Sequence, residues 1–163
     1  MPDLEKLVQR LIEHNVEFVI VGGYAAAAHG VTLTTFDVDV CSPFTFENLE
    51  RVYRSLAELH PYPRETPQEI PFVMPGDFKL RNLYLHTDLG QIDFLGEVLG
   101  VGDYATVLAH SKVAQLPYGQ CRIIDGATLV KAKEAMGRQK DLFAAQQLRA
   151  ILEASSKNSG PGN

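Results

Sequence analysis

The sequence predicts an α+β fold, with a mixed β-sheet, helices mainly on one face and a helical C-terminal section. Short runs of β-branched and aromatic residues, typical of buried strands, alternate with stretches whose apolar residues recur every three or four positions, typical of amphipathic helices. Glycine and proline separate these stretches. The chain has 163 residues, 45% hydrophobic and 21% charged, which suits one domain. We expect a single domain over 1–154 and a disordered tail over 155–163.

Composition excludes several classes of protein. The formal net charge of -5 argues against a surface that binds nucleic acid throughout, because such binding depends on Lys and Arg. Cys41 and Cys121 lack the spacing of a zinc or redox motif, so no disulfide framework is expected. No apolar run approaches the roughly 20 residues of a membrane span, and the N-terminus lacks the features of a signal peptide. We therefore expect a soluble, cytoplasmic protein without a membrane partner.

Five elements are expected in the first 60 residues, from hydrophobic periodicity and turn residues. Asp3 can cap the first helix, and Gly22-Gly23 ends the first strand. His29-Gly30 stops a short helix of alanines, since glycine adopts the left-handed conformation without steric cost. The expected elements are a helix over 3–14, a strand over 17–21, a helix over 25–28, a strand over 34–41 and a helix over 45–60.

The rest of the chain begins with a segment of five prolines, 61–75, which we expect to be a surface loop or edge excursion and a candidate lid. Asp88 and Gly90 mark the turn of the hairpin that follows. Gly137 divides a C-terminal helical pair. The expected elements are a hairpin over 78–95, a short helix and then strands over 113–116 and 121–124, and helices over 127–137 and 140–154.

Gly22, Gly23, Asp37 and Asp39 form the most informative pattern. In a strand, residues two apart project to the same side with Cα atoms about 6.5 Å apart, so both carboxylates can reach a pair of metal ions about 4 Å apart. The glycines let the backbone approach phosphates, and the following helix start offers N–H donors. An Asp-x-Asp pair also occurs on solvated strand edges. The apolar neighbours of Asp37 and Asp39 favour burial of this strand, and buried charges are costly unless they are paired or bind a metal. Two aspartates in such a strand therefore indicate a functional role.

This pattern resembles the nucleotidyltransferase superfamily to which DNA polymerase beta belongs: an apolar residue, Gly-Gly or Gly-Ser, a gap, then Asp-apolar-Asp-apolar. The short motifs are most similar to those of a small prokaryotic branch of minimal nucleotidyltransferases and abortive-infection toxin nucleotidyltransferases. The matching residues are Gly22 to Ala25, His29-Gly30 and Asp37 to Val40. The resemblance implies that a nucleotidyl group moves from a nucleoside triphosphate to a hydroxyl acceptor, on RNA, protein or a small molecule, with release of pyrophosphate. It implies two Mg²⁺ ions, with Mn²⁺ as an alternative.

The resemblance also implies a third carboxylate from a later strand, and Asp93 in GQIDFL stands where such a residue is expected. If Ile92 and Phe94 face the core, Asp93 looks outward over the end of the sheet. It would then complete the metal site with Asp37 and Asp39, or take the proton of the attacking hydroxyl. The alternative is a polar residue on the exposed face of a hairpin.

A second motif that resembles the family is Lys-x4-Arg-x-Lys-Asp near the C-terminus, formed by Lys133, Arg138, Lys140 and Asp141. Its cations would meet the triphosphate or an acidic acceptor; the alternative is a solvated helix face. Tyr24, just after the glycines, could flank a base or sugar, although such a ring is more often a packing residue.

Two departures from the family pattern leave another class of function open. Relatives often carry an arginine where this chain has Leu33, and an acidic residue near Ala144 or Ala145. The alternative is a weak or inactive nucleotide-binding or regulatory module of the same fold, as part of a toxin-antitoxin pair, with a homodimer or an antitoxin-type protein as partner. A metal-dependent phosphohydrolase is a weaker alternative, because its usual histidine-rich cluster is missing from the sequence.

Overall fold

The computed structural model describes residues 2–67, 70–74 and 80–158. Seven of its strands form one mixed sheet in the order β3-β4-β5-β2-β1-β9-β8, and β6 and β7 form a two-stranded ribbon. β1 runs parallel to β9 and β2 runs parallel to β5. These results confirm the expected α+β class with a mixed sheet. The strands are β1 (Val19–Val21), β2 (Asp37–Cys41), β3 (Tyr62–Pro63), β4 (Asn82–Thr87), β5 (Gly90–Leu95), β6 (Glu97–Val98), β7 (Gly102–Asp103), β8 (Ser111–Leu116) and β9 (Gly119–Ile124).

The helices begin at side-chain caps that the sequence places there. Asp3 accepts a hydrogen bond from the backbone N–H of Lys6, and Thr45, Asp103 and Asp125 cap later helices in the same way, which satisfies N–H groups that a helix start leaves free. The helices are α1 (Leu4–Glu13), α2 (Gly22–Ala28), α3 (Phe46–Leu56), the 3₁₀ turn η1 (Ala57–Leu59), α4 (Tyr104–Ala109), α5 (Gly126–Met136) and α6 (Gln139–Asn158).

The main core lies on one face of β2 and β5. Val38 and Val40 of β2 stand beside Ile92 and Phe94 of β5 in parallel register, and all four are buried. α1 contacts both strands and packs against α3, so its apolar stripe covers this face. Because successive side chains of a strand alternate between faces, the residues between these four lie on the opposite face.

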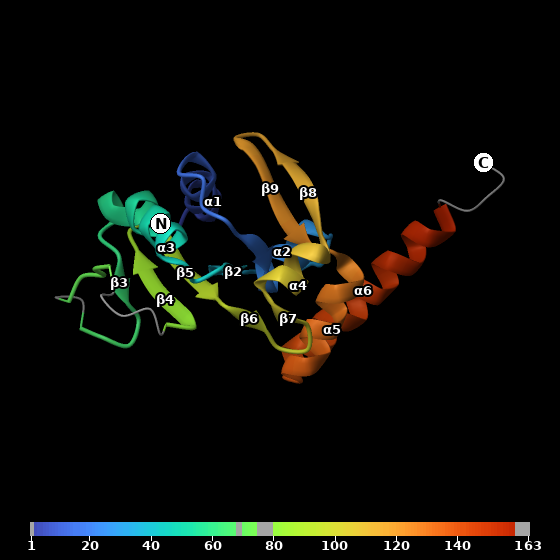
Figure 1. Cartoon of the computed structure of the whole chain (residues 1–163). Coiled ribbons are helices and arrows are strands. Elements are labelled where there is room, and N and C mark those ends of the chain that lie inside the picture. Colours follow the sequence, from blue (N-terminus) through green and yellow to red (C-terminus); the bar gives the residue numbers. More distant parts are fainter. Residues whose placement is uncertain (1, 68–69, 75–79, 159–163) are drawn as a thin grey trace.

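The C-terminal section is the expected helical pair. α5 ends at Gly137, whose φ of 71° is left-handed, so the chain turns there and α6 packs back along α5. Figure 1 shows this pair at one end of the molecule, with the last turns of α6 extending away from the rest. α6 continues to Asn158, so 155–158 of the expected tail are helical, whereas 159–163 lie outside the described residues. The domain boundary at 154 stays a prediction.

Two elements differ from the expectation. The proline-rich segment contains a short edge strand, β3, which pairs with β4; residues 68–69 and 75–79 lie outside the described part, so the lid stays a prediction. The β6–β7 ribbon was not expected, because two-residue strands carry no periodic signal. Among the described residues no helix is long and apolar enough to cross a bilayer.

Candidate functional site

Three carboxylates meet on the face of the sheet opposite the main core. Asp37 and Asp39 come from β2 and Asp93 comes from β5, where Asp39 and Asp93 are direct partners in parallel register. Each of the three offers an oxygen, and these oxygens all lie within 4.8 Å of one another. The structure therefore brings together the three aspartates that the sequence singled out.

The electrostatics of this cluster favour a bound cation. Burial, with repulsion by Asp37 and Asp93, raises the pKa of Asp39 to about 7. Burial also raises the pKa of Asp93, although the charge of Arg64 opposes the rise. The Oδ1 atom of Asp93 is buried and has no hydrogen-bond partner among the described residues. Three hard oxygen donors with an unpaired buried acceptor fit Mg²⁺ or Mn²⁺.

The expected position of Asp93 is partly corrected. Ile92 and Phe94 do face the core, and Asp93 does point to the other side. Asp93 is nevertheless only 7% exposed, and does not look outward into solvent. β5 lies inside the sheet between β4 and β2, and Arg64 covers the carboxylate from the preceding segment.

Gly22 and Gly23 lie at the start of α2, next to Asp39. Gly22 has a φ of +68°, and a Cβ built on it would lie 2.3 Å from Oδ2 of Asp39. A side chain there would collide with the carboxylate, so glycine is required for the close approach of β1 to β2. At Gly23 a Cβ would meet Thr35 Oγ1 at 3.2 Å and Leu33 Cδ1 at 3.7 Å.

Two of the three expected cations lie beside the carboxylates. Lys133 and Arg138 line one pocket of about 120 Å³ together with Gly22 and Asp39. Asp141, only 1% exposed, accepts hydrogen bonds from Lys133 Nζ at 3.5 Å and Arg138 Nε at 2.5 Å. Burial alone would raise the pKa of Asp141, but the Arg138 hydrogen bond and the charge of Lys133 keep it below its ordinary value. Asp141 thus holds both cations at the pocket.

Lys140 and Tyr24 are not brought to this pocket. Lys140 is exposed near the start of α6 and is not among the lining residues. Tyr24 is half-buried, and its side chain interacts with that of Tyr118 in the turn between β8 and β9. Tyr24 packs against the hydrophobic core, and a contact of its ring with a base or sugar stays a prediction.

Arg64 is the residue of this site that the sequence did not indicate. Its Nη2 lies 2.9 Å from Oδ2 of Asp93, and its Nη1 donates to Oε1 of Gln91 at 3.0 Å. Arg64 belongs to the proline-rich segment, where no periodic pattern predicts the direction of a side chain. An arginine between prolines just before a carboxylate hairpin was the available signal, and it is a weak one.

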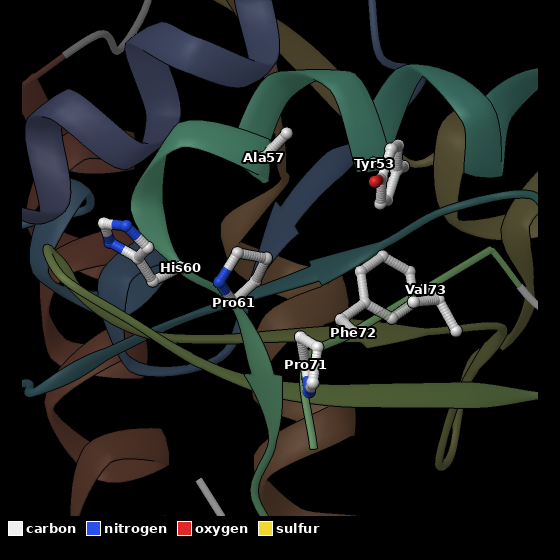
Figure 2. Close-up of a pocket in the computed structure, with 7 residues that line it drawn as sticks. All are labelled: Tyr53, Ala57, His60, Pro61, Pro71, Phe72 and Val73. Carbon is white, nitrogen blue, oxygen red and sulfur yellow. The ribbon is translucent and has the colours of Figure 1, made fainter. Parts of the chain in front are cut away.

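A larger hollow lies elsewhere, between the end of α3 and residues 60–61 and 71–73. Figure 2 shows Tyr53 of α3 and Ala57 of η1 facing Pro61, Pro71 and Phe72 across it. Its volume is about 460 Å³, yet none of the three carboxylates lines it. Tyr53 and Phe72 pack with ring centroids 5.9 Å apart. The chemistry is concentrated in the smaller pocket, which we take as the candidate site.

No model of a known protein family matches this sequence, and no curated protein matches it. Several solved structures match this chain. A protein of Thermotoga maritima assigned as a nucleotidyltransferase has 17% sequence identity and a TM-score of 0.55, over 92% of this chain and 90% of that one.

Two structures of the antibiotic-resistance factor ANT(2″)-Ia also match. A solution structure shares 12% identity at a TM-score of 0.55, over 94% of this chain and 89% of that one. A crystal structure in complex with adenylyl-2″-tobramycin shares 13% at 0.54, over 96% of both chains. At such identities the likeness concerns the fold, and it confirms the nucleotidyltransferase fold along nearly the whole chain.

Proposed function

We propose that this chain, which has the nucleotidyltransferase fold, is a metal-dependent nucleotidyltransferase. The observation that carries the proposal is the meeting of Asp37, Asp39 and Asp93, with oxygens within 4.8 Å of one another, beside a pocket that Lys133 and Arg138 also line. The substrates would be a nucleoside triphosphate and a molecule with a free hydroxyl group.

The transfer requires a cation site, a proton acceptor and compensation for phosphate charge. The hydroxyl oxygen attacks the α-phosphorus, the bond to the bridging oxygen breaks, and pyrophosphate leaves. Asp37 and Asp39 would hold two Mg²⁺ or Mn²⁺ ions, which would supply positive charge at the attacking and leaving oxygens. Asp93, through its unpartnered Oδ1, would be the third ligand or accept the proton of the hydroxyl.

The triphosphate would lie toward α5 and α6. The charges of Lys133 and Arg138 both act on the carboxylate cluster, since Lys133 lowers the pKa of Asp39 and Asp39 raises that of Arg138. Gly22 lines the same pocket without a side chain, so phosphate oxygens can approach the backbone there. Lys140 would act at most at the periphery.

A second candidate is a module that binds nucleotide without transferring it, and one observation favours it. Leu33, where the family pattern expects an arginine, places an apolar atom beside Gly23, so one phosphate contact is lost. In that case the protein would be regulatory. A homodimer, an antitoxin-type partner and a place in a toxin-antitoxin pair remain predictions.

The test supplies α-labelled nucleoside triphosphates with Mg²⁺ to the protein in a cell extract, and in parallel with purified RNA and with an aminoglycoside as a polyhydroxylated small molecule. The variants are Asp37→Asn and, as a matched control, Asp88→Asn, an exposed aspartate paired with His60. Label should pass to an acceptor with the wild type and Asp88→Asn, and with Asp37→Asn it should fall at least 100-fold.

The two candidates give different results. Nucleotide binding without any transfer would identify the regulatory module. If no nucleotide binds at millimolar Mg²⁺, both candidates fail. Release of phosphate in the absence of an acceptor would indicate a phosphohydrolase.

A further inference from the structure

Arg64 makes a set of contacts that the proposed transfer does not by itself require. Its guanidinium spans Asp93 and Gln91, two residues apart on β5, through hydrogen bonds of 2.9 and 3.0 Å. The Cζ atom also lies over the ring of Tyr84, 5.0 Å from its centroid. Tyr84 is the β4 partner of Asp93 in the sheet. The arginine is thus held by three side chains that share one face.

The backbone of Arg64 is fixed as well. Its N–H donates to the Tyr84 carbonyl at 3.0 Å, directly after the β3–β4 pairing of Pro63 with Leu85. Thr66 closes a turn by donating its N–H and its hydroxyl to the Pro63 carbonyl. An arginine anchored at both ends keeps its fork in one place, and a lysine could not make the two parallel contacts.

The two oxygens of Asp93 consequently have different surroundings. Oδ2 accepts from Arg64, whereas Oδ1 is buried without a hydrogen-bond partner among the described residues. The carboxylate is one of the three whose oxygens gather within 4.8 Å. Because Oδ2 is hydrogen-bonded to Arg64, rotation of the carboxylate is restricted. Oδ1 is then the oxygen that can bind a metal ion or accept a proton.

We propose that Arg64 is a positioning residue, which binds one oxygen of Asp93 and so fixes the other as the atom that serves the reaction. The inference rests on the proposed function. In the sheet order β4-β5-β2-β1, Arg64 lies over β4 and β5, whereas Gly22 and Lys133 stand beside Asp39. Arg64 therefore lies on the side of the cluster away from Lys133, which would bind the triphosphate. The acceptor hydroxyl would approach the cluster from the Arg64 side.

This role gives two effects of opposite sign. Removing a positive charge next to three carboxylates should strengthen the binding of a divalent cation, because like charges repel. Releasing Asp93 should slow the transfer, because a misplaced reacting group costs rate. A residue that only held the segment to the sheet would weaken cation binding and transfer together when it is removed.

The experiment compares Arg64→Gln with Arg10→Gln. Both arginine side chains are 28% exposed and each pairs with one carboxylate, but Arg10 pairs with Glu58, outside the cluster. Mn²⁺ alone is titrated by calorimetry, and label transfer from α-labelled ATP is followed as a function of ATP concentration. For Arg64→Gln we expect Mn²⁺ binding about 3- to 10-fold tighter. The maximal rate should fall at least 10-fold, with the half-saturating ATP concentration within about twofold of wild type.

A second variant keeps the charge and removes one anchor. Gln91→Leu should slow the maximal rate about 3- to 10-fold and leave Mn²⁺ affinity unchanged, because Arg64 then holds Asp93 with a single partner. Arg10→Gln should match the wild type in every measurement. The proposal is overturned if Arg64→Gln transfers label at the wild-type rate, or if its Mn²⁺ affinity falls along with the rate. If the wild type transfers no label, the proposed function fails, and equal Mn²⁺ affinities in the two arginine variants would then overturn the placement of Arg64.

Discussion

Replacing Gly22 by alanine should damage the carboxylate site, whereas the same change at the adjacent Gly23 should be mild. Gly22 has a φ of +68°, and its new Cβ would lie 2.3 Å from Asp39 Oδ2 and 2.8 Å from Asp39 Cβ. Contacts this short cannot persist, so either Asp39 or the backbone must move. Gly23 is not among the glycines with positive φ, and its nearest contact would be the Thr35 hydroxyl at 3.2 Å.

The magnitudes follow from two terms. A left-handed conformation costs a residue with a Cβ about 1–2 kcal/mol, and the displacement of a packed group adds about 1–3 kcal/mol. Gly22→Ala should therefore lose about 2–5 kcal/mol of unfolding free energy. In Gly23→Ala the gain of up to about 1 kcal/mol for alanine over glycine in a helix offsets the tight contact, so its stability should change by less than about 1 kcal/mol.

Urea unfolding in EDTA measures both changes, and calorimetric titration with Mn²⁺ reports the site. Because Asp39 must shift in Gly22→Ala, Mn²⁺ affinity should fall at least 10-fold there and stay within about threefold in Gly23→Ala. Equal stability and equal Mn²⁺ affinity in the two variants would refute the claim that a bare backbone at Gly22 is needed to seat Asp39.

Three further predictions concern single side chains. Burial and the neighbouring carboxylates raise the pKa of Asp39 from 3.8 to about 7, so folding favours its protonated form; in EDTA the wild type should lose stability relative to Asp39→Asn as pH rises from about 4 through about 7. The loss is at most about 4 kcal/mol, and about 2 kcal/mol is expected because Asp39 stays partly exposed to water; parallel pH curves would contradict it. Asp141→Asn leaves two cations without their buried partner and should lower the unfolding free energy in urea by about 2–4 kcal/mol. The control Glu134→Gln, whose ion pair is exposed, should lose less than about 1 kcal/mol. Equal losses would count against Asp141 as the residue that holds Lys133 and Arg138. Leu33→Arg restores the cation of the family pattern and should tighten ATP binding about 3- to 10-fold at low salt. A concentration of 0.5 M salt should largely remove this effect. An unchanged ATP affinity at low salt would contradict the placement of the phosphates beside Gly23.

The part of the site that the sequence predicts is the part governed by local periodicity. Alternation in β2 is enough to place Asp37 and Asp39 on one face, because the side-chain period of a strand is fixed. The same alternation predicts that Asp93 opposes Ile92 and Phe94. Capping residues and Gly137 likewise gave the helix boundaries to within a few residues, because these signals act over one turn.

The part that the sequence did not predict depends on pairing between distant segments. β5 lies parallel to β2, although the elements between them in sequence include α3 and the proline-rich segment. This crossover makes Asp93 a buried neighbour of Asp39, and no local pattern encodes it. Arg64 depends on the pairing of a two-residue edge strand, β3. Lys140 and Lys133 could not be distinguished, because their roles depend on how the left-handed Gly137 orients α6 against α5.

The charges gathered around the site nearly balance one another. Four aspartates, Asp141 among them, stand against three cations, Arg64, Lys133 and Arg138, so the fully ionised cluster carries one excess negative charge. Two divalent ions alone would add four positive charges, and a triphosphate alone would add about four negative ones. Bound together they leave the local charge nearly unchanged, which keeps the cost of burial low. Under the proposed function, a site of this composition would favour joint binding of the metal ions and the nucleotide over either one alone, as a transferase that must hold both requires.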